Sequence, residues 1–594
     1  MTDIPARLTA LREEMRHERV GACIVTNYDP HHSEYSGLHW LAREFVSGFT
    51  GSAGDLVVFA EGGGLWTDGR YFIQAEEQLR GTGLELFKMR IEGTPSIPEH
   101  LAALLTSGAQ VAVAGNSINT SSYNELHQTL EANQITLRTD LDLVSRIWRD
   151  RPERSLAPAL DYPLEFAGRT VTEKLAEVRA NLPATDGLII SALPDIAWLL
   201  NLRGGDVPYC PLLESYLYVE VTGDSPRTVL CVNQAKLSPT LQTRLNSEGV
   251  EFADYSAILE LAGASRGRMS LCPQSTPSDV YVAVREAGAT ITLAPPPTEK
   301  TKAAKNRVEQ QVFREALRYD GVAMTRFARW LEANVAQGSV TELAAEKVLC
   351  GYRAELPNFL EESFHTIAGF GAHAALMHYG ATPESDAVVD DSALFLVDSG
   401  GQYLGGTTDI TRTFAFGEVS EQQRMDYTRV LQAVIRLSQT RFRKGACGCN
   451  LDIMARGVLW QYGIDYECGT GHGVGQCLVV HEGPQGLNQR LNNVPFEPGM
   501  SITNEPGIYR EGKHGVRIEN IMQVVHAETT EFGEFYAFET LTLAPIQTRP
   551  LVLELLQPQE KDWLNSYHER VYKEVSPLLE QADKEWLELA CAAI

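Results

Sequence analysis

Four acidic side chains and one histidine in the last third of the chain could do chemistry together. Two of the acids lie in SALFLVDSGGQYLGGTTDITRTFAF (residues 392–416), a pattern typical of a strand, a glycine-rich turn and a returning strand. Asp398 ends the first apolar run, and Asp409 begins the β-branched run that follows. Either aspartate alone is explained as a turn former. A hairpin, however, can bring both onto one side of a sheet.

The second pair of acids lies in SITNEPGIYREGKHGVRIENIMQVV (residues 501–525). Glu505 follows a short predicted strand, and Glu519 lies inside the predicted strand GVRIENIMQVV between apolar residues. A buried carboxylate there needs a counter-charge. Arg517, two residues earlier, shares the face of Glu519 because side chains alternate along a strand.

The histidine is His472, in YECGTGHGVGQ (residues 466–476), where glycine occupies four alternate positions. A phosphate-binding GxGxxG loop is excluded because Gln476 stands where its last glycine would be. Taken alone, His472 is explained by a structural bulge. A role in chemistry requires partners, and the four carboxylates can supply them.

Four carboxylates with one imidazole form an oxygen-rich ligand set. Such a set suits Mn²⁺, Co²⁺, Fe²⁺ or Zn²⁺, and differs from a thiolate zinc finger. Two divalent cations would neutralise the four negative charges, and Arg517 would balance a bridging hydroxide.

The segment that must position these residues is predicted to be α+β. Asn306 and Glu309 form a capping-box pattern before a long amphipathic helix, and Ser420 with Gln423 repeats the pattern before a second helix. Strand-like runs and glycine turns lie between the two helices.

Two proline-containing connectors, residues 149–163 and 293–306, precede this segment. In front of each connector a helix pattern is followed by an apolar strand: the stripe Ile4, Leu8, Leu11 and Met15 precedes residues 21–27, and residues 172–182 precede residues 186–193. This order predicts two related α/β domains. We expect domains at 1–155, 156–300 and 301–594.

The composition of the chain excludes some classes of protein function. The net charge of −26 argues against nucleic-acid binding, which requires a basic surface. No apolar run approaches the length of a membrane span, and the N-terminus lacks a signal-peptide core, so no membrane partner is expected. Ten scattered cysteines without CxxC pairs predict reduced thiols and a cytoplasmic location.

The motifs VDSGGQYLGGTTDITRTF, GTGHGVG, VHEGP, NEPGIYR and GVRIEN resemble, in order and spacing, those of the pita-bread metallopeptidase family M24. The likeness is strongest to cytosolic three-domain aminopeptidases P and covers nearly the whole chain. WTDGRYFIQAEEQL is similar to their first domain, GGDVPYCPLLESYL to their second, and residues from about 541 to 594 to their C-terminal extension. The resemblance implies two creatinase-like α/β domains followed by a pita-bread α+β catalytic domain.

The resemblance also implies a role for each matching residue. Asp398 would bind one metal ion, His472 and Glu505 a second, and Asp409 and Glu519 both. His378 and His481 would bind the substrate and stabilise the intermediate. Tyr509 and Arg517 would line the site and bind substrate. Two Mn²⁺ ions per subunit are expected, with Zn²⁺ or Co²⁺ as alternatives, and so is a homodimer.

The reaction that the resemblance implies is release of the N-terminal amino acid from peptides with proline second. A metal-activated hydroxide would attack, with His378, His481 and Glu505 as catalytic residues. A prolidase that cuts only Xaa-Pro dipeptides is the nearest alternative, although prolidases usually have one α/β domain fewer. Creatinase lacks the metal ligands. A non-catalytic pita-bread module that binds proteins is an alternative from another class, and it too lacks the ligand set.

One position departs from the family pattern. The family has His-Gly-Thr-Gly-His where this chain has CGTGH, so Cys468 replaces a histidine that lines the substrate pocket. The metal ligands are untouched. We expect Cys468 to fill space rather than to make the site sensitive to oxidation.

Overall fold

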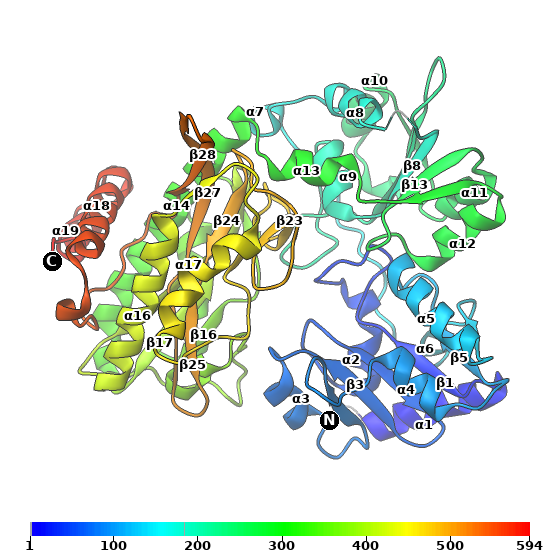
Figure 1. Ribbon diagram of the computed structural model, residues 1–594, viewed down its shortest axis with the longest axis horizontal. Helices are drawn as coiled ribbons and strands as arrows, with labels where there is room; N and C mark the ends of the chain where they lie inside the picture. Colours follow the sequence, from blue (N-terminus) through cyan, green and yellow to red (C-terminus); the bar gives the residue numbers. More distant parts are fainter. Residues whose placement is uncertain (1–2, 183) are drawn as a thin grey trace. The chain divides into compact units, whose positions relative to one another are not determined.

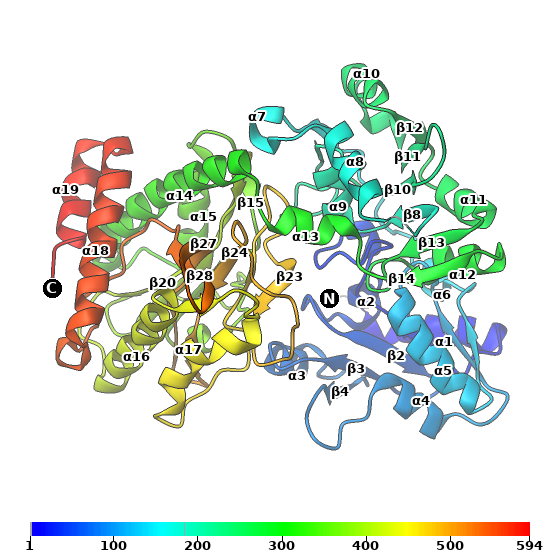
Figure 2. The ribbon, with the colours of Figure 1, turned by 45° about the horizontal axis from the view of Figure 1, so that its top comes forward.

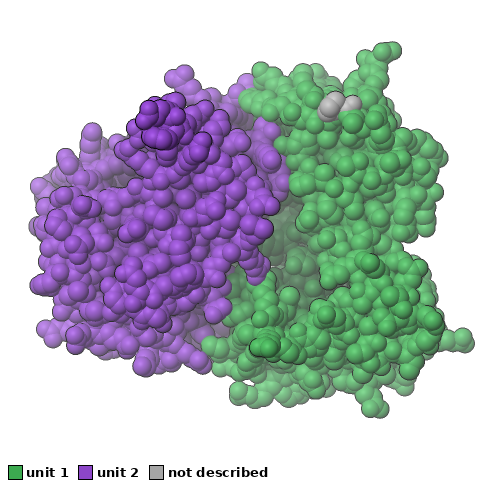
Figure 3. Space-filling view, in the orientation of Figure 1, with its two compact units in different colours: residues 1–162, 169–298 green, residues 163–168, 299–594 purple. Residues whose placement is uncertain are grey.

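The computed structural model describes residues 3–182 and 184–594. The chain forms two compact units, coloured separately in Figure 3: unit 1 contains residues 1–162 and 169–298, and unit 2 contains residues 163–168 and 299–594. The predicted domain limits near residues 155 and 300 stay predictions.

Unit 1 contains two six-stranded sheets of the same topology (Figure 1). The first has the order β4-β3-β2-β1-β5-β6 and the second β12-β11-β10-β8-β13-β14. The first sheet consists of β1 (Ala22–Val25), β2 (Asp55–Phe59), β3 (Gly63–Thr67), β4 (Glu85–Lys88), β5 (Gln110–Val113) and β6 (Thr136–Arg138). The second consists of β8 (Gly187–Ile190), β10 (Ser215–Glu220), β11 (Thr228–Val232), β12 (Val250–Ala253), β13 (Arg268–Leu271) and β14 (Thr290–Leu293). The prediction of two related α/β domains is therefore confirmed.

The helices of unit 1 cover these sheets with apolar faces. Helix α1 (Ile4–His17) buries the whole predicted stripe, Ile4, Leu8, Leu11 and Met15. The others that accompany the first sheet are α2 (Ala42–Ser47), α3 (Phe72–Gln78), α4 (Ile97–Leu104), α5 (Thr120–Ala132) and α6 (Leu143–Ile147). Those of the second are α8 (Val171–Ala180), α9 (Leu193–Leu199), α10 (Pro239–Ser247), α11 (Ala257–Ala264) and α12 (Ser278–Glu286). The short strands β7 (Leu160–Asp161) and β9 (Leu202–Arg203) pair with each other.

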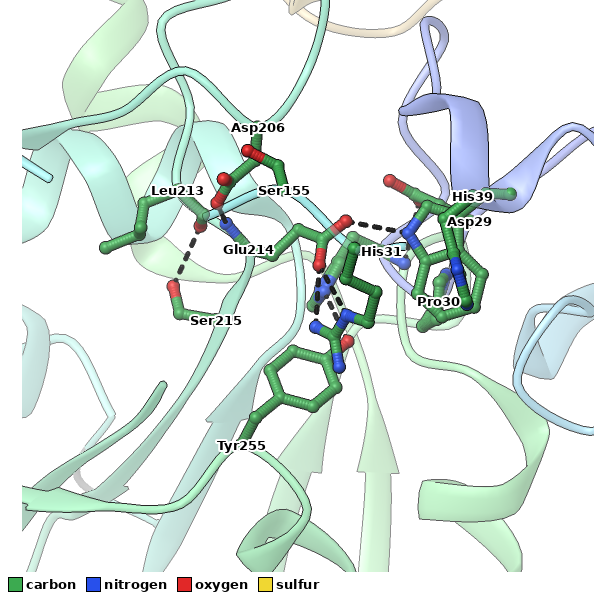
Figure 4. A network of polar contacts seen from close by, with 12 residues as sticks. Asp29, Pro30, His31, His39, Ser155, Asp206, Leu213, Glu214, Ser215 and Tyr255 are labelled. Carbon is green, nitrogen blue, oxygen red and sulfur yellow. Dashed lines mark hydrogen bonds and ion pairs between the residues drawn. The ribbon is translucent and has the colours of Figure 1, made fainter. Parts of the chain in front are cut away.

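A buried polar network joins the two halves of unit 1 (Figure 4). Glu214 forms an ion pair with Arg154 at 2.6 Å and accepts a hydrogen bond from Trp40 Nε1 at 2.7 Å. His31 Nδ1 donates to the carbonyl of Ser191 at 2.9 Å, and Tyr255 donates to His31 Nε2 at 2.8 Å. Because His31 belongs to the first half while its partners follow β8 and β12, these bonds fix one half against the other.

Unit 2 is the predicted α+β segment. Its helices are α7 (Leu164–Ala167), α13 (Pro297–Ala303, which begins at the end of unit 1), α14 (Arg307–Asn334), α15 (Glu342–Ala354), α16 (Glu421–Ser438), α17 (Gly448–Trp460), α18 (Pro558–Val575) and α19 (Gln581–Ala590). Both predicted capping boxes are present: Asn306 caps α14 with Glu309, and Ser420 caps α16 with Gln423. Figure 2 shows α18 and α19 side by side at the C-terminal end, as does Figure 1.

Two sheets of unit 2 carry the residues of interest. One has the order β16-β17-β20 and the other β21-β28-β27-β24. The strands are β16 (Ile367–Phe370), β17 (Leu394–Ser399), β20 (Ile410–Ala415), β21 (Arg441–Arg443), β24 (Ser501–Asn504), β27 (Asn520–Thr530) and β28 (Gly533–Thr540). Smaller sheets contain β15 (Phe359–Glu362), β18 (Gly401–Tyr403), β19 (Gly406–Thr407), β22 (Gly471–Gly473), β23 (Glu482–Leu487), β25 (Gly507–Arg510) and β26 (His514–Arg517).

Each of these two sheets is covered by its own pair of helices. Phe327 of α14 and Leu349 of α15 share one apolar cluster with Phe395 of β17. Leu437 of α16 and Leu451 of α17 share another with Met522 of β27, among other residues. The sheets are thereby held as rigid supports, which is what a precise ligand set requires.

The prediction that GVRIENIMQVV forms one continuous strand is wrong. Strand β26 ends at Arg517 and β27 begins at Asn520, so Glu519 lies in the break between them. The backbone of Glu519 pairs with the edge of β20 instead: its N–H donates to the carbonyl of Thr411 at 3.1 Å, and its carbonyl accepts from Arg412 at 2.6 Å. The break directs the Glu519 carboxylate toward Thr411.

Candidate metal centre

The predicted hairpin brings the two aspartates together. Strands β17 and β20 are antiparallel, with Asp398 opposite Thr411. Asp409 directly precedes β20, two residues before Thr411, so the pleat places it on the same face. Asp398 is 7% exposed and Asp409 4%.

His472 lies between Asp409 and Glu505. Its Nε2 atom is 3.4 Å from Asp409 Oδ2 and 3.4 Å from Glu505 Oε1. Its Nδ1 atom donates to the carbonyl of Gly473 at 2.9 Å. Because Nδ1 carries this proton, the lone pair of the neutral ring is on Nε2, which is the atom that faces the carboxylates.

Glu519 completes the group. Among the described residues, one metal-binding arrangement is found: Asp409, His472 and Glu519 each offer a ligand atom, and these atoms lie within 4.8 Å of one another. Glu505 lies beside this group, 3.4 Å from His472, and Asp398 is linked to Glu519 by hydrogen bonds through Arg517 and Thr411. All five residues predicted as ligands therefore converge.

The glycines around His472 allow close approach of the backbone. A Cβ atom on Gly471 would overlap the carbonyl oxygen of Thr503, and one on Gly473 would overlap that of Glu482. With side chains at these positions, β22 could not lie against β24 and the start of β23. The alternating glycines thus keep His472 against the strand that leads to Glu505.

The site carries more negative charge than its protein partners can balance. Arg517 donates to Asp398 Oδ2 at 2.6 Å and to Thr411 Oγ1 at 3.0 Å, and Thr411 donates to Glu519 Oε2 at 2.8 Å. The second oxygens, Asp398 Oδ1 and Glu519 Oε1, are buried and make no hydrogen bond within the described part of the chain. Burial raises the pKa of Asp398 to about 7 and, together with the neighbouring carboxylates, raises the pKa of Glu519 well above its ordinary value. Divalent cations would supply the missing partners, so the residues fit a metal site.

Of the remaining predicted site residues, His481 contacts His472 and Tyr509 contacts Arg517, whereas His378 is placed only by the elements around it. The ring of His481, just before β23, lies 4.3 Å from that of His472 at an angle of 89°. Tyr509, on β25, accepts a hydrogen bond from Arg517 at 2.7 Å. His378 follows the 3₁₀ helix η4 (Gly371–Ala375), which packs on β26, the strand that ends at Arg517.

Two threonines of the site were missed from the sequence. Thr411 bridges Arg517 and Glu519, as described above. Thr503 Oγ1 accepts from the backbone of His472 at 3.0 Å and donates to Glu505 at 3.3 Å. Each lies two residues from a predicted ligand on a strand, so the alternation of side chains could have identified both.

Comparisons with known proteins cover the whole chain. Residues 311–526 match Metallopeptidase family M24, and residues 534–594 match the C-terminal region of peptidase M24. Residues 7–142 and 150–309 each match the Creatinase/Prolidase N-terminal domain. Aminopeptidase P2 of Arabidopsis thaliana is 37% identical over 98% of this chain and 88% of its own length. The chain belongs to metallopeptidase family M24.

Other members of this family support the assignment. Probable Xaa-Pro aminopeptidase P of Talaromyces marneffei is 38% identical over 98% of this chain and 90% of its own length. The crystal structure of X-prolyl aminopeptidase from Caenorhabditis elegans, described as a cytosolic enzyme with a di-nuclear active site, superposes with a TM-score of 0.94 at 30% identity and covers 100% of both chains. The predicted resemblance and fold class are confirmed.

A structure of Xaa-Pro dipeptidase from Bacillus anthracis shares the fold of part of the chain, with a TM-score of 0.52 at 24% identity over 64% of this chain. A protein-binding module without metal ligands does not match the convergent carboxylates. Among the described residues, no helix is long and apolar enough to span a membrane.

Cys468, the departure from the M24 pattern, packs like Tyr509 against a buried apolar cluster that includes Val516 and Ile518. Burial raises the pKa of its thiol to about 12, so the thiol is neutral at physiological pH. Its carbonyl accepts a hydrogen bond from Arg456 at 3.0 Å. This environment fits a side chain that fills space.

Proposed function

We propose that the protein is a metalloaminopeptidase that releases the N-terminal amino acid from peptides with proline in the second position. The observation that carries the proposal is the group formed by His472, Asp409 and Glu519, with Glu505 3.4 Å from His472 Nε2. Within the described part of the chain, one buried oxygen of Asp398 and one of Glu519 make no hydrogen bond. The full-length likeness to relatives called aminopeptidase P supports this peptide class over Xaa-Pro dipeptides.

The five converging residues would hold two divalent ions. Asp398 would bind the first, His472 and Glu505 the second, and Asp409 and Glu519 would bridge them. Two ions match the charge of four carboxylates, and the C. elegans neighbour is described as di-nuclear. We propose Mn²⁺, because carboxylate-rich ligation suits it, with Zn²⁺ and Co²⁺ as alternatives.

The bound metals would supply an activated water and a polarised scissile carbonyl. The protein's own groups bind the peptide and move the proton. Glu505 would carry a proton from the attacking water to the proline nitrogen, which has no N–H in the peptide bond. His378 and His481 would bind the substrate amine or carbonyl and stabilise the developing negative charge. Arg517, with Tyr509 beside it, would hold Asp398 in place.

The test is hydrolysis by protein reconstituted with Mn²⁺, comparing an Xaa-Pro-Xaa tripeptide with the Xaa-Pro dipeptide. We expect release of the first residue from the tripeptide and much slower cleavage of the dipeptide. Asp409→Asn and Glu519→Gln should each lose bound metal and activity together. Preference for the dipeptide would favour a prolidase, and full activity of either variant would exclude the two-metal mechanism.

We also propose a homodimer that contacts through the outer face of α17. Ile453 and Trp460, two turns apart on this helix, are 43% and 46% exposed, and Tyr462 just beyond it is 51% exposed. Leu491 is 80% exposed, and its neighbour Asn492 contacts Cys449 one turn before Ile453. Contiguous exposed apolar side chains commonly mark protein contacts.

A cytoplasmic location is proposed as well. Its support is the description of the C. elegans neighbour as cytosolic. The reduced state predicted for the cysteines agrees with that compartment.

A further inference from the structure

Glu342 is a fully buried carboxylate outside the metal centre. It occupies the first turn of α15 and is 0% exposed. Its two oxygens accept hydrogen bonds from four donors: Phe370 N at 2.7 Å, His373 Nδ1 at 2.9 Å, Tyr379 Oη at 2.9 Å and Ala387 N at 3.1 Å. The helix N-terminus adds a favourable dipole. Four donors and this dipole compensate for burial of the charge.

All four donors belong to one segment, which begins at Phe370, ends at Ala387 and carries His378. The rings of His373 and Tyr379 stack with centroids 4.5 Å apart, and both donate to Glu342. His378 directly precedes Tyr379. Because the Tyr379 side chain is held at Glu342, the backbone that carries His378 has little freedom at that end.

The backbone and one neighbouring strand hold the other end of the segment. Leu376 N donates to the carbonyl of His373 at 3.0 Å, and Tyr379 N donates to that of Leu376 at 3.0 Å. A Cβ on Gly515 of β26 would overlap the carbonyl of Ala374, so η4 sits directly on this strand. The strand therefore fixes η4, while Glu342 fixes the residues on both sides of His378.

We propose that Glu342 is a positioning residue for His378: its carboxylate gathers the segment 370–387 so that His378 is presented to the substrate. The proposal rests on the proposed function, which gives His378 its substrate. Glu342→Gln replaces one acceptor oxygen with an NH₂ group that would face N–H or O–H donors. In either orientation of the amide, one backbone N–H, that of Phe370 or that of Ala387, loses its acceptor, and the segment around His378 loosens.

The experiment is a double-mutant cycle with Mn²⁺-loaded protein. We expect E342Q to lower kcat/KM for an Xaa-Pro-Xaa peptide about 10- to 100-fold, since small displacements of a substrate-positioning group have effects of this order. Metal content should match the wild type. In an H378A background, E342Q should lower kcat/KM less than about twofold further, because residues that act through one another are not additive. E355Q is the matched control: Glu355 follows the other end of α15 and pairs with Arg326 at the surface.

Hydrogen exchange supplies a readout that does not require activity. Amides of residues 371–387 should exchange faster in E342Q than in the wild type, while those of β17 and β20 should not change. If E342Q does not fold, Tyr379→Phe removes one donor and leaves the carboxylate intact, and the same cycle applies.

Three results would overturn the proposal: kinetics of E342Q equal to the wild type, an equal loss in the H378A background, or loss of bound metal. If the wild type cleaves no Xaa-Pro peptide, the proposed function fails. Exchange that is unchanged in residues 371–387 would separately refute the role of Glu342.

Discussion

At the scale of residues, the site is defined by buried charge that lacks protein partners. Asp398 and Glu519 each keep one oxygen that no described residue hydrogen-bonds, although Arg517 and Thr411 hold the other. An unpaired buried carboxylate is unfavourable by several kcal/mol, on the order of the penalties known for buried ions. A bound cation would supply the partner that each of these oxygens lacks.

Substitution of Thr411 tests how strongly metal binding depends on the residues that hydrogen-bond the ligands. Thr411→Val keeps the shape but removes the hydrogen bond to Glu519 and the acceptor for Arg517. We expect metal affinity to fall about 10- to 100-fold, as for other residues that orient ligands. Thr440→Val is the control, because its hydroxyl donates only to the end of α16. Equal metal affinity in the two variants would show that Glu519 needs no such support.

Substitution of Cys468 tests the effect of having cysteine where the family pattern has histidine. Cys468→His should leave metal content unchanged and raise kcat/KM about tenfold, roughly the effect of one added hydrogen bond to substrate. Cys468→Ala should stay within about twofold of the wild type, because the neutral thiol only fills space. Metal analysis and peptide kinetics check both variants. A changed metal stoichiometry in Cys468→His would place this residue among the ligands.

The residue types indicated that each of the five residues could bind a metal ion. They did not show that the five residues share one site. Asp398 and Asp409 share a predicted hairpin, so local pattern sufficed for their proximity. His472 and Glu519 meet Asp409 only through pairings between distant strands, which a single sequence does not reveal. The resemblance to the family, rather than periodicity, brought them together before the structure did.

At the scale of elements, local signals predicted helices well and strand ends poorly. The stripe of α1 and the capping boxes of α14 and α16 depend on residues within a few positions, and all are present. The break between β26 and β27 depends on Thr411 and Arg412, which lie far away in sequence. The contacts between Glu342 and the segment 370–387 likewise join residues that are far apart in sequence, so no local sequence pattern predicted them.

Helix α18 contains a buried histidine that makes stability depend on pH. His568 is 0% exposed and its Nε2 accepts from the backbone of Ile546 at 3.1 Å. Burial, and secondarily the charge of Arg412, lowers its pKa to about 4, whereas an unfolded histidine titrates near 6.5. The unfolded chain therefore binds this proton first as pH falls. The contribution of His568 to the free energy of unfolding is therefore greatest above about pH 6.5. It falls by roughly 3 kcal/mol as the pH is lowered to 4.

His568→Gln keeps an acceptor for Ile546 but cannot be protonated. We expect the free energy of unfolding of the wild type to fall by roughly 3 kcal/mol more than that of the variant between pH 7.5 and pH 4. Urea unfolding at both values measures the difference. His127→Gln, at an exposed position of α5, is the control. An identical pH dependence of wild type and His568→Gln would contradict the assignment.

At the scale of the whole molecule, one topology is used twice and then a different unit follows. The two sheets of unit 1 share the same strand order, and the same N-terminal domain description matches both halves. The sequence predicted this repeat from helix-then-strand order alone, because each half begins with its own amphipathic helix. The pairing of the later strands, which are only three to six residues long, had no comparable signal.

The proposed dimer belongs to this scale. Trp460→Glu places a charge on the exposed apolar face of α17 and should convert a dimer into a monomer, raising the dissociation constant at least about 100-fold. Sedimentation measures the change. Leu578→Glu, at an exposed apolar position outside that face, is the control. A wild type that is monomeric, or a Trp460→Glu variant that stays dimeric, would contradict the proposed interface.

The most direct test of the central claim is the metal content of the purified protein together with its activity. We expect two divalent ions per chain after Mn²⁺ reconstitution, and release of the first residue from an Xaa-Pro-Xaa peptide that disappears on chelation and returns with metal. Asp409→Asn should show neither metal nor activity. Full peptidase activity in metal-free protein, or stoichiometric metal in that variant, would contradict the account.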